Sequence, residues 1–387
     1  QGDVALSNNF PSSADLTFTA RQGAFLASGE ANGRIRLTEG AGDQTAILDV
    51  TGRNVRLTGQ DWTLRNLSLK GQGTLDRLPF TLAADVGGAN PVQFNGSGEY
   101  ARQGQAQSLT LRGGGRVREI AFTTRAPAVF ALNGDGRVAR LDLGVGGGFL
   151  TGELKQDSEG SVIQADMTNV EMGSLVPDLR GQVTGRVSMQ GQGDTLRGSA
   201  NVDLRQLRSL DAPRGLAVDG TLNADLTGDA LRLRAEAHNG TAVQATADVT
   251  LPVETSAAPL RLAIARTENL SGQIAIRGQI QPIWDLFLGG AQSLSGQVNG
   301  QATLAGTLNA PRLNGRLDLN EGAFRDGTTG LRLENMTLAS RFNDSQAVIE
   351  RFQATDGVKG EVSGSGDLGL RQGSPSTLRL ELARFQI

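Results

Sequence analysis

The sequence LSGQVNGQATLAGTLNAPRLNGRLDL, which runs from Leu294 to Leu319, decides the fold class. From Leu294 to Leu308 every even position is apolar or glycine, and every odd position except Ala305 is polar. Because a strand points successive side chains to opposite faces of its sheet, this run has one apolar face and one polar face. The segment 309–312 interrupts the alternation with a proline, which cannot donate to a sheet ladder, and the alternation resumes at Leu313. We therefore predict two long strands joined by a tight turn.

The same pattern occurs earlier in the chain. The stretch 179–191 repeats the glycine-punctuated alternation that begins at Leu294, and the stretch 196–204 repeats its partner strand. A repeated unit of long, two-faced strands is typical of a repetitive all-β body. The predicted fold class is therefore all-β, an elongated and curved antiparallel β-sheet that forms a groove (a β-taco), with repeated meanders and one or two short helices.

Strands of this kind are expected on both sides of the repeat. In the first half, alternation runs over residues 78–86 and 92–100. In the middle, a meander from Leu216 to Leu251 contains the turn signals Gly228-Asp229 and Asn239-Gly240. Turns this short join antiparallel neighbours.

Two stretches break the alternation, at 172–177 and at 282–291. The second has Pro282 at a possible first helical turn, with Ile283 and Phe287 at helical spacing. We expect a short helix or an ordered loop in each, and we interpret the second as a plug on the apolar face. A slip in the alternation at Asn335 indicates a bulge.

No shift in composition divides the chain. We interpret residues 1–178 as the N-terminal part of a continuous β-groove and residues 179–387 as its repeated long-strand region. The sequence opens on Gln1 in a polar stretch, and its last residues still alternate. We therefore interpret it as a segment of a longer protein.

Composition argues against several classes of function. The 387 residues include 53 glycines and carry a net charge of −3 without a basic cluster, which argues against nucleic-acid binding. Cysteine is absent and His238 is the single histidine, so we predict no catalytic residues, no metal site and no cofactor. The sequence GSGDLG at 364–369 matches the dinucleotide motif, but no helical pattern follows it, as that motif requires.

The glycine-punctuated alternation of Leu294–Leu319, with a proline-bearing turn in the middle, resembles the TamB family. The stretches 331–342 and 360–370 continue this pattern, and 179–204 is a second copy of it. The TamB family belongs to the AsmA-like group of periplasmic bridge proteins of Gram-negative bacteria.

The resemblance implies a long, taco-shaped sheet with an apolar lumen and no enzymatic activity. It also implies a periplasmic location, an inner-membrane anchor outside this segment, and a partner outer-membrane barrel of the TamA type. The implied function is to carry lipid acyl chains, phospholipid being the expected cargo, between the inner and outer membranes and so to support outer-membrane biogenesis.

Other interpretations remain open at this point. An outer-membrane barrel needs aromatic girdles, and the chain has 2 Trp and 1 Tyr. A secreted β-helix adhesin should have short strands, and a packed β-sandwich should carry bulky residues where this chain has glycine and alanine. A scaffold that templates β-strands of outer-membrane proteins, together with an assembly barrel, is a further alternative, because exposed strand edges pair readily.

The apolar positions of the clean alternating runs are the residues expected to line the groove. They are Val183, Val187, Met189, Val202, Leu204, Leu222, Leu226, Leu231, Leu233, Ile274, Ile276, Ile280, Leu294, Val298, Leu304, Leu308, Leu313, Leu317, Leu319, Leu331 and Leu333.

Overall fold

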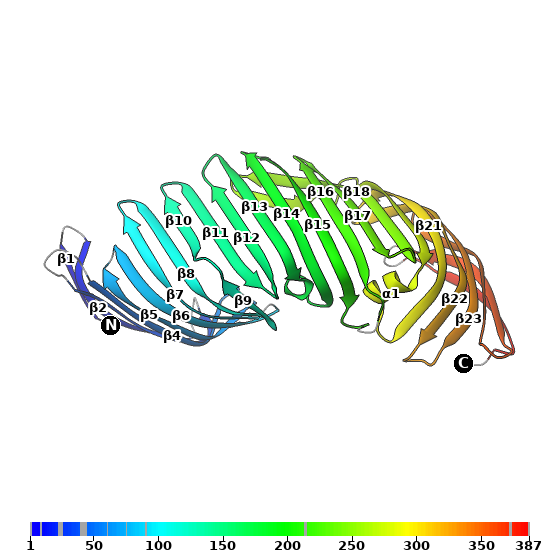
Figure 1. The fold of residues 1–387 in the computed structure, drawn as a ribbon, viewed down its shortest axis with the longest axis horizontal. Helices are drawn as coiled ribbons and strands as arrows, with labels where there is room; N and C mark the ends of the chain where they lie inside the picture. The colour runs from blue at the N-terminus through cyan, green and yellow to red at the C-terminus, as the bar shows by residue number, and fades with distance from the viewer. Residues whose placement is uncertain are drawn as a thin grey trace. The chain divides into compact units, whose positions relative to one another are not determined.

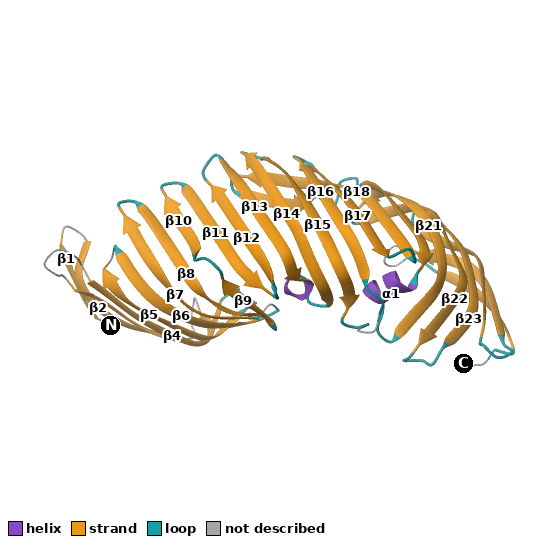
Figure 2. Cartoon of the chain, viewed as in Figure 1, coloured by secondary structure: helices purple, strands orange, loops and turns teal. Residues whose placement is uncertain are grey.

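The computed structural model describes residues 2–7, 10–21, 26–38, 45–59, 61–74, 76–89, 91–212, 215–370 and 374–385. The chain forms two compact units: unit 1 contains residues 1–158 and 162–174, and unit 2 contains residues 159–161 and 175–387. Both units consist of β-strands, and every described strand pair within them is antiparallel (Figures 1 and 2). The predicted all-β antiparallel fold class is confirmed, and a parallel β-helix is incompatible with this pairing.

Unit 1 is a meander in which most strands pair with their neighbours in sequence. Its strands are β1 (Gly2–Ser7), β2 (Phe10–Ala20), β3 (Leu26–Thr38), β4 (Thr45–Leu57), β5 (Thr63–Thr74), β6 (Arg77–Gly87), β7 (Val92–Gln103), β8 (Ala106–Val117), β9 (Ile120–Thr124), β10 (Ala128–Asn133), β11 (Gly136–Val145), β12 (Gly148–Gln156) and β13 (Gly160–Glu171). The short strands β9 and β10 each pair with both β8 and β11, so together they fill one strand position. The strands predicted over 78–86 and 92–100 are β6 and β7.

Unit 2 contains the repeated long strands. Its elements are β14 (Leu179–Gln192), β15 (Thr195–Ser209), β16 (Val218–Thr227), β17 (Ala230–Asn239), β18 (Val243–Ala257), β19 (Leu260–Ile264), β20 (Ser271–Gln279), α1 (Gln281–Phe287), β21 (Gln292–Thr307), β22 (Ala310–Asp326), β23 (Arg332–Asn343), β24 (Gln346–Thr355), β25 (Glu361–Gly369) and β26 (Thr377–Ala383). Strands β21 to β23 bend along their length (Figure 1).

The two strands predicted from the opening stretch are β21 and β22, but the turn between them is shorter than expected. The strand β21 ends at Thr307 and β22 begins at Ala310, so only Leu308 and Asn309 form the turn. Pro311 therefore lies within β22, opposite Gly306. The amide of Leu313 donates to the carbonyl of Asp344, which lies just past the end of β23. The nitrogen of Pro311 points to the same side of β22 but lies beyond the end of β23. Its missing N–H therefore removes no hydrogen bond between the two strands.

The two predicted breaks in the alternation are helical. Met172–Ser174 is a 3-10 helix in unit 1, and α1 occupies the second break. The bulge predicted at Asn335 is also present, since this residue has a φ of 51° and the register between β23 and β24 shifts beside it. The glycine motif at 364–369 lies within β25, which confirms that it is not a dinucleotide-binding turn.

Within the described residues, no helix has the length and apolar character that crossing a membrane requires.

Candidate functional site

The strand register of unit 2 aligns apolar residues into rows across the sheet. Directly paired residues share one face of a sheet, so successive pairs from β14 to β22 form each row. Three rows contain no polar side chain. The first is Val183, Leu204, Gly220, Ala237, Ala245, Ile276, Gly300 and Leu317. The second is Gly185, Val202, Leu222, Ala235, Ala247, Ile274, Ala302 and Gly315. The third is Val187, Ala200, Ala224, Leu233, Val249, Gly272, Leu304 and Leu313. We call the sheet face that carries these rows the apolar face.

Shorter rows continue the apolar face on both sides. On one side the row is Met189, Gly198, Leu226, Leu231 and Leu251. On the other side it is Val243, Gly278, Val298, Leu319 and Leu338. The register therefore brings most of the predicted groove residues to one face, although they come from strands far apart in the sequence.

The remaining predicted residues lie at the ends of strands. Leu294 of β21 pairs with Phe324 of β22, and Phe324 pairs in turn with Leu333 of β23. Ile280 immediately precedes α1 and packs against the buried residues nearby. Leu331 immediately precedes β23. Leu308 lies in the turn after β21 and is 42% exposed, so the alternation ends one residue earlier than predicted.

Two packed clusters border the open part of the apolar face. One contains Val298, Leu319, Met336, Ala354 and Val362, with Ile276, Ile280, Leu294, Leu317 and Leu333 among the residues packed against it. The other contains Leu196, Leu226, Val253 and Ala257, with Met189 and Leu231 packed against it. The three rows lie between these clusters along the strand direction, and their residues are mostly half-buried.

An open cavity of about 460 Å³ lies over the middle of the apolar face. Carbon atoms line almost all of it. Its floor consists largely of small residues of β17, β18 and β21, namely Ala235, Ala237, Ala245, Ala247, Gly300 and Ala302. Ile274 lies in this cavity and is 37% exposed, whereas Gln273, its neighbour in the chain, points to the polar face.

The helix α1 forms one wall of the cavity, as predicted for a plug on the apolar face. Ile283 and Phe287, which are one helical turn apart, both line the cavity. Pro282 and Leu286 are buried, and Trp284 meets Phe324 edge-on with ring centroids 6.3 Å apart. Phe287 itself is 72% exposed, so it stands at the opening of the cavity and the described residues leave most of its ring uncovered.

The sequence did not single out the alanine floor. Ala235, Ala237, Ala245 and Ala247 occupy odd positions of two strands that alternate clearly, but alanine is a weak apolar signal and only the register places the four side by side. Because each side chain is small, the floor is recessed relative to the leucine and isoleucine positions around it.

The polar face carries the charged residues of the same strands in ion pairs. Arg232 donates from Nε to Asp248 Oδ1 at 2.9 Å and from Nη2 to Oδ2 at 2.6 Å. This hydrogen bonding lowers the pKa of Asp248. Arg234 pairs with Asp225 on the same face. Charge is thus held on one face of the sheet, and the three rows of the other face carry none.

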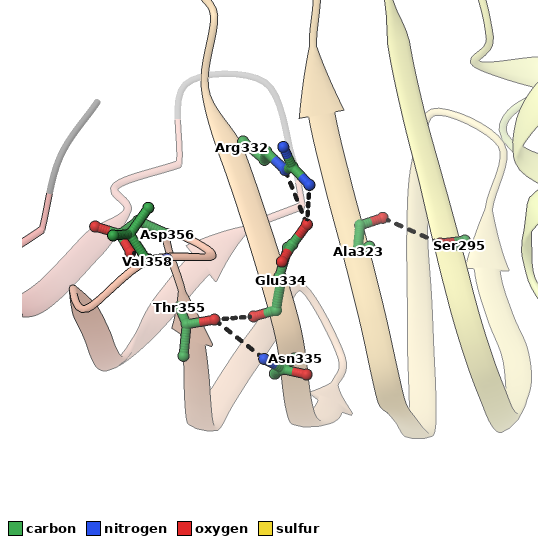
Figure 3. Close-up of polar contacts among 8 residues, drawn as sticks. All are labelled: Ser295, Ala323, Arg332, Glu334, Asn335, Thr355, Asp356 and Val358. Carbon is green, nitrogen blue, oxygen red and sulfur yellow. Dashed lines mark hydrogen bonds and ion pairs between the residues drawn. The ribbon is translucent and has the colours of Figure 1, made fainter.

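Polar side chains also stabilise the bulged end of unit 2 (Figure 3). Beside the bulge, the Asn335 side-chain amide donates to Thr355 Oγ1 at 3.2 Å, and that hydroxyl donates to the Glu334 carbonyl at 3.2 Å. Arg332 Nε donates to Glu334 Oε1 at 2.8 Å. The two hydrogen bonds of Thr355 join β23 and β24 where the ladder is interrupted, and the Arg332 contact lies within β23.

Residues 163–335 match the family model of the TamB C-terminal domain. This part of the chain, somewhat less than half of it, is therefore similar to the TamB C-terminal domain. The matched part covers the strands from β14 to β22 and therefore all three apolar rows. The comparisons with curated proteins and with solved structures found no match.

The described residues contain no group of three or more His, Cys, Asp or Glu side chains placed to hold a metal ion. The candidate site is a surface for apolar contact, formed by the three rows, the cavity and α1.

Proposed function

We propose that unit 2 shelters the acyl chains of phospholipids on its apolar face and lets them pass along it, as part of lipid traffic between the inner and outer membranes. In this proposal the chain acts without catalysis, in the periplasm, with an inner-membrane anchor outside this segment and an outer-membrane barrel of the TamA type as partner. The half-buried residues of the three rows and the recessed alanine floor make the contacts, whereas the predicted groove residues Leu226, Val298 and Leu319 are buried in the packed clusters beside them.

The observation that carries the proposal is the unbroken apolar character of three neighbouring rows across β14 to β22. A fully packed core would fill this face with bulky side chains. Instead, alanine and glycine leave an open, carbon-lined cavity of about 460 Å³. A volume of this size lies within the range of sites that hold small ligands.

The free energy of burying methylene groups is consistent with an acyl chain that slides along the apolar face. Burial of one methylene contributes about 0.8 kcal/mol, so an acyl chain of about sixteen carbons needs on the order of 13 kcal/mol of apolar contact to leave a membrane. The apolar face can supply such contact along its whole width. Because the contacts are non-directional, neighbouring positions on the face have similar free energies.

The proposal is tested by a charge placed in the open cavity. Ile274→Asp should abolish co-purification of phospholipid, because a carboxylate opposes an acyl chain at the centre of the floor. Since Ile274 is already 37% exposed, water can solvate the new charge and the sheet should remain folded. The measurements are native mass spectrometry of the purified protein for bound lipid and circular dichroism for the fold.

Gln273→Asp is the matched control, because it adds the same charge one residue away on the polar face. It should retain lipid at the level of the unmodified chain. If the unmodified chain carries no lipid, or if both variants carry as much as it does, acyl-chain transport by this face is wrong.

A second candidate is the templating of a client β-strand of an outer-membrane protein. The observation in its favour is β19, which among the described strands pairs only with β18 and so leaves one edge free. A free edge can pair with the main chain of an extended segment. Crosslinking that captures polypeptide instead of lipid at unit 2 would favour this candidate.

A further inference from the structure

The strand β18 is longer than its neighbours, and its last five residues leave the main sheet. Residues up to Pro252 pair with β17, and residues up to Thr250 pair with β20. Val253–Ala257 instead pair with β19. We call this small hairpin, formed by Val253–Ala257 and β19, the arm.

Main-chain hydrogen bonds fasten the arm across the hairpin turns at one end of the sheet. The amide of Val253 donates to the Asp229 carbonyl at 2.8 Å, in the turn between β16 and β17. The amide of Ala257 donates to the Gly193 carbonyl at 2.8 Å, in the turn between β14 and β15. The hydroxyl of Thr255 donates to the Gly228 carbonyl at 3.1 Å. One edge of the arm is therefore fixed along successive turns.

Side-chain packing shows which face of the arm is turned toward the sheet. Val253 is 5% exposed and Ala257 is fully buried, and both pack with Leu196 and Leu226 of the apolar face. The arm therefore lies over the apolar face and not over the polar one.

The strand β19 presents apolar side chains on this same side of the arm. The register pairs Ile264 with Val253, Leu262 with Thr255 and Leu260 with Ala257, and paired residues share a face. The side chains of Leu260, Leu262 and Ile264 thus point toward the apolar face. They nevertheless remain 38% to 45% exposed, so the described part of the chain does not bury them.

The position of β19 follows from the hydrogen bonds of β18. The amides of Val253 and Ala257 point to the turns, so β19 pairs with the opposite edge, away from the turns. With one edge of the arm fixed at the turns and its apolar side facing the sheet, β19 overhangs the apolar face. Arg261, which lies on the outer side of the arm, pairs there with Glu254 at 2.9 Å.

We propose that β19 is the roof of a covered site for one acyl chain, which lies between Leu260, Leu262 and Ile264 above and the apolar face below. This inference rests on the proposed function and adds to it a position where the lipid is enclosed on two sides. At such a position an acyl chain contacts both surfaces and cannot move away from the sheet in the direction that β19 covers.

A hydrocarbon chain suits this space better than a polypeptide. Both walls present side-chain carbon, and a hydrocarbon needs no hydrogen-bond partner. A peptide lying between two side-chain faces would leave its own amides and carbonyls unpaired, at a cost of several kcal/mol each in an apolar site. A client strand would instead pair with the free outer edge of β19.

The experiment places a photo-crosslinking amino acid, p-benzoylphenylalanine, at Leu262, at Arg261 or at Ile274 of the full chain. Each protein is irradiated with vesicles of phosphatidylethanolamine and phosphatidylglycerol, and the adducts are identified by mass spectrometry. We expect lipid adducts at Leu262 beneath the roof and at Ile274 in the open cavity. The matched control at Arg261, one residue away on the outer side of the arm, should give at most a tenth of the Leu262 yield.

The outcomes separate this inference from the proposed function. Lipid adducts at Ile274 without adducts at Leu262, or equal yields at Leu262 and Arg261, overturn the covered site and leave lipid binding intact. Failure at both Leu262 and Ile274 overturns both proposals. If a nascent outer-membrane polypeptide added to the reaction is captured at Leu262 in place of lipid, the arm serves client strands. All three replaced side chains are at least 37% exposed or on the outer side of the arm, so the fold should tolerate the probe.

Discussion

Asp285 is a buried carboxyl group beside an otherwise apolar site. It lies in α1 with 7% of its surface exposed and accepts hydrogen bonds from the Leu216 amide and the Gln281 side chain. Burial raises its pKa above the ordinary value, and the two hydrogen bonds offset only part of that effect. Asp285 thus fastens the helix that forms one cavity wall to the segment between β15 and β16.

The raised pKa of Asp285 predicts the direction of a pH effect on stability. The folded state binds this proton more tightly than the unfolded state, so the free energy of unfolding falls as pH rises from below 3.8 through the folded-state pKa and is constant above it. Asp285→Asn keeps an oxygen acceptor for the Leu216 amide and cannot ionise. We therefore expect its melting temperature at neutral pH to equal or exceed that of the unmodified chain.

Thermal unfolding at several pH values checks this expectation. The advantage of Asp285→Asn over the unmodified chain should shrink as the pH is lowered, because the native carboxyl is then protonated too. Asp285→Ala, which removes the acceptor as well, should be less stable than Asp285→Asn at every pH. An Asn variant that loses stability only at neutral pH would show that the ionised form is favourably paired.

At the scale of elements, the turn from β24 to β25 depends on a single carboxylate. Asp356, 9% exposed, accepts hydrogen bonds at its Oδ1 from the amides of Val358, Lys359 and Gly360 at 2.8, 3.1 and 2.9 Å. Asp356→Ala would leave these amides without their partner, and we expect a loss of about 2 kcal/mol in the free energy of unfolding. Urea unfolding measures this. Asp367→Ala, at an exposed position of β25, is the control and should change stability by less than about 0.5 kcal/mol.

Local sequence predicted the strands and the helix better than it predicted the arm and the cavity that they form. The alternation around Val298 and Leu317 was enough to assign their common face, because side-chain direction in a strand depends only on counting by twos. The spacing of Ile283 and Phe287 predicted a short helix or an ordered loop, and the structure has the helix α1 there. The arm was not predicted, because β18 keeps its alternation through Ala257 and departs only where its neighbours have ended.

The same limit applies to the cavity. Alanine at 235 and 247 gives little signal in a sequence, and the recess they form exists only because the register places them opposite each other and beside Ile274. Register depends on the relative lengths of strands and on bulges such as that at Asn335, and neither follows from one strand taken alone.

At the scale of the whole chain, charge and apolar surface are separated. The 37 basic and 40 acidic residues nearly cancel, and on unit 2 the ion pairs of Arg232 and Arg234 lie on the polar face. The three apolar rows carry no charge with which a lipid headgroup could pair. If acyl chains are the recognised part of the ligand, the protein should distinguish poorly between headgroups.

This predicts that lipid binding is insensitive to salt and to headgroup charge. Apolar burial gives a negative heat-capacity change on binding and is not screened by ions, whereas contacts between exposed charges weaken as ionic strength rises. Titration calorimetry with short-chain phosphatidylglycerol and phosphatidylcholine, at low and at high salt, should give affinities for the two lipids within about threefold of each other, a difference of under 1 kcal/mol. The heat-capacity change should be negative for both and should be lost in Ile274→Asp. An affinity that falls steeply with salt for the anionic lipid alone would assign recognition to a charged surface outside the apolar face, and the rows would then act only as a scaffold.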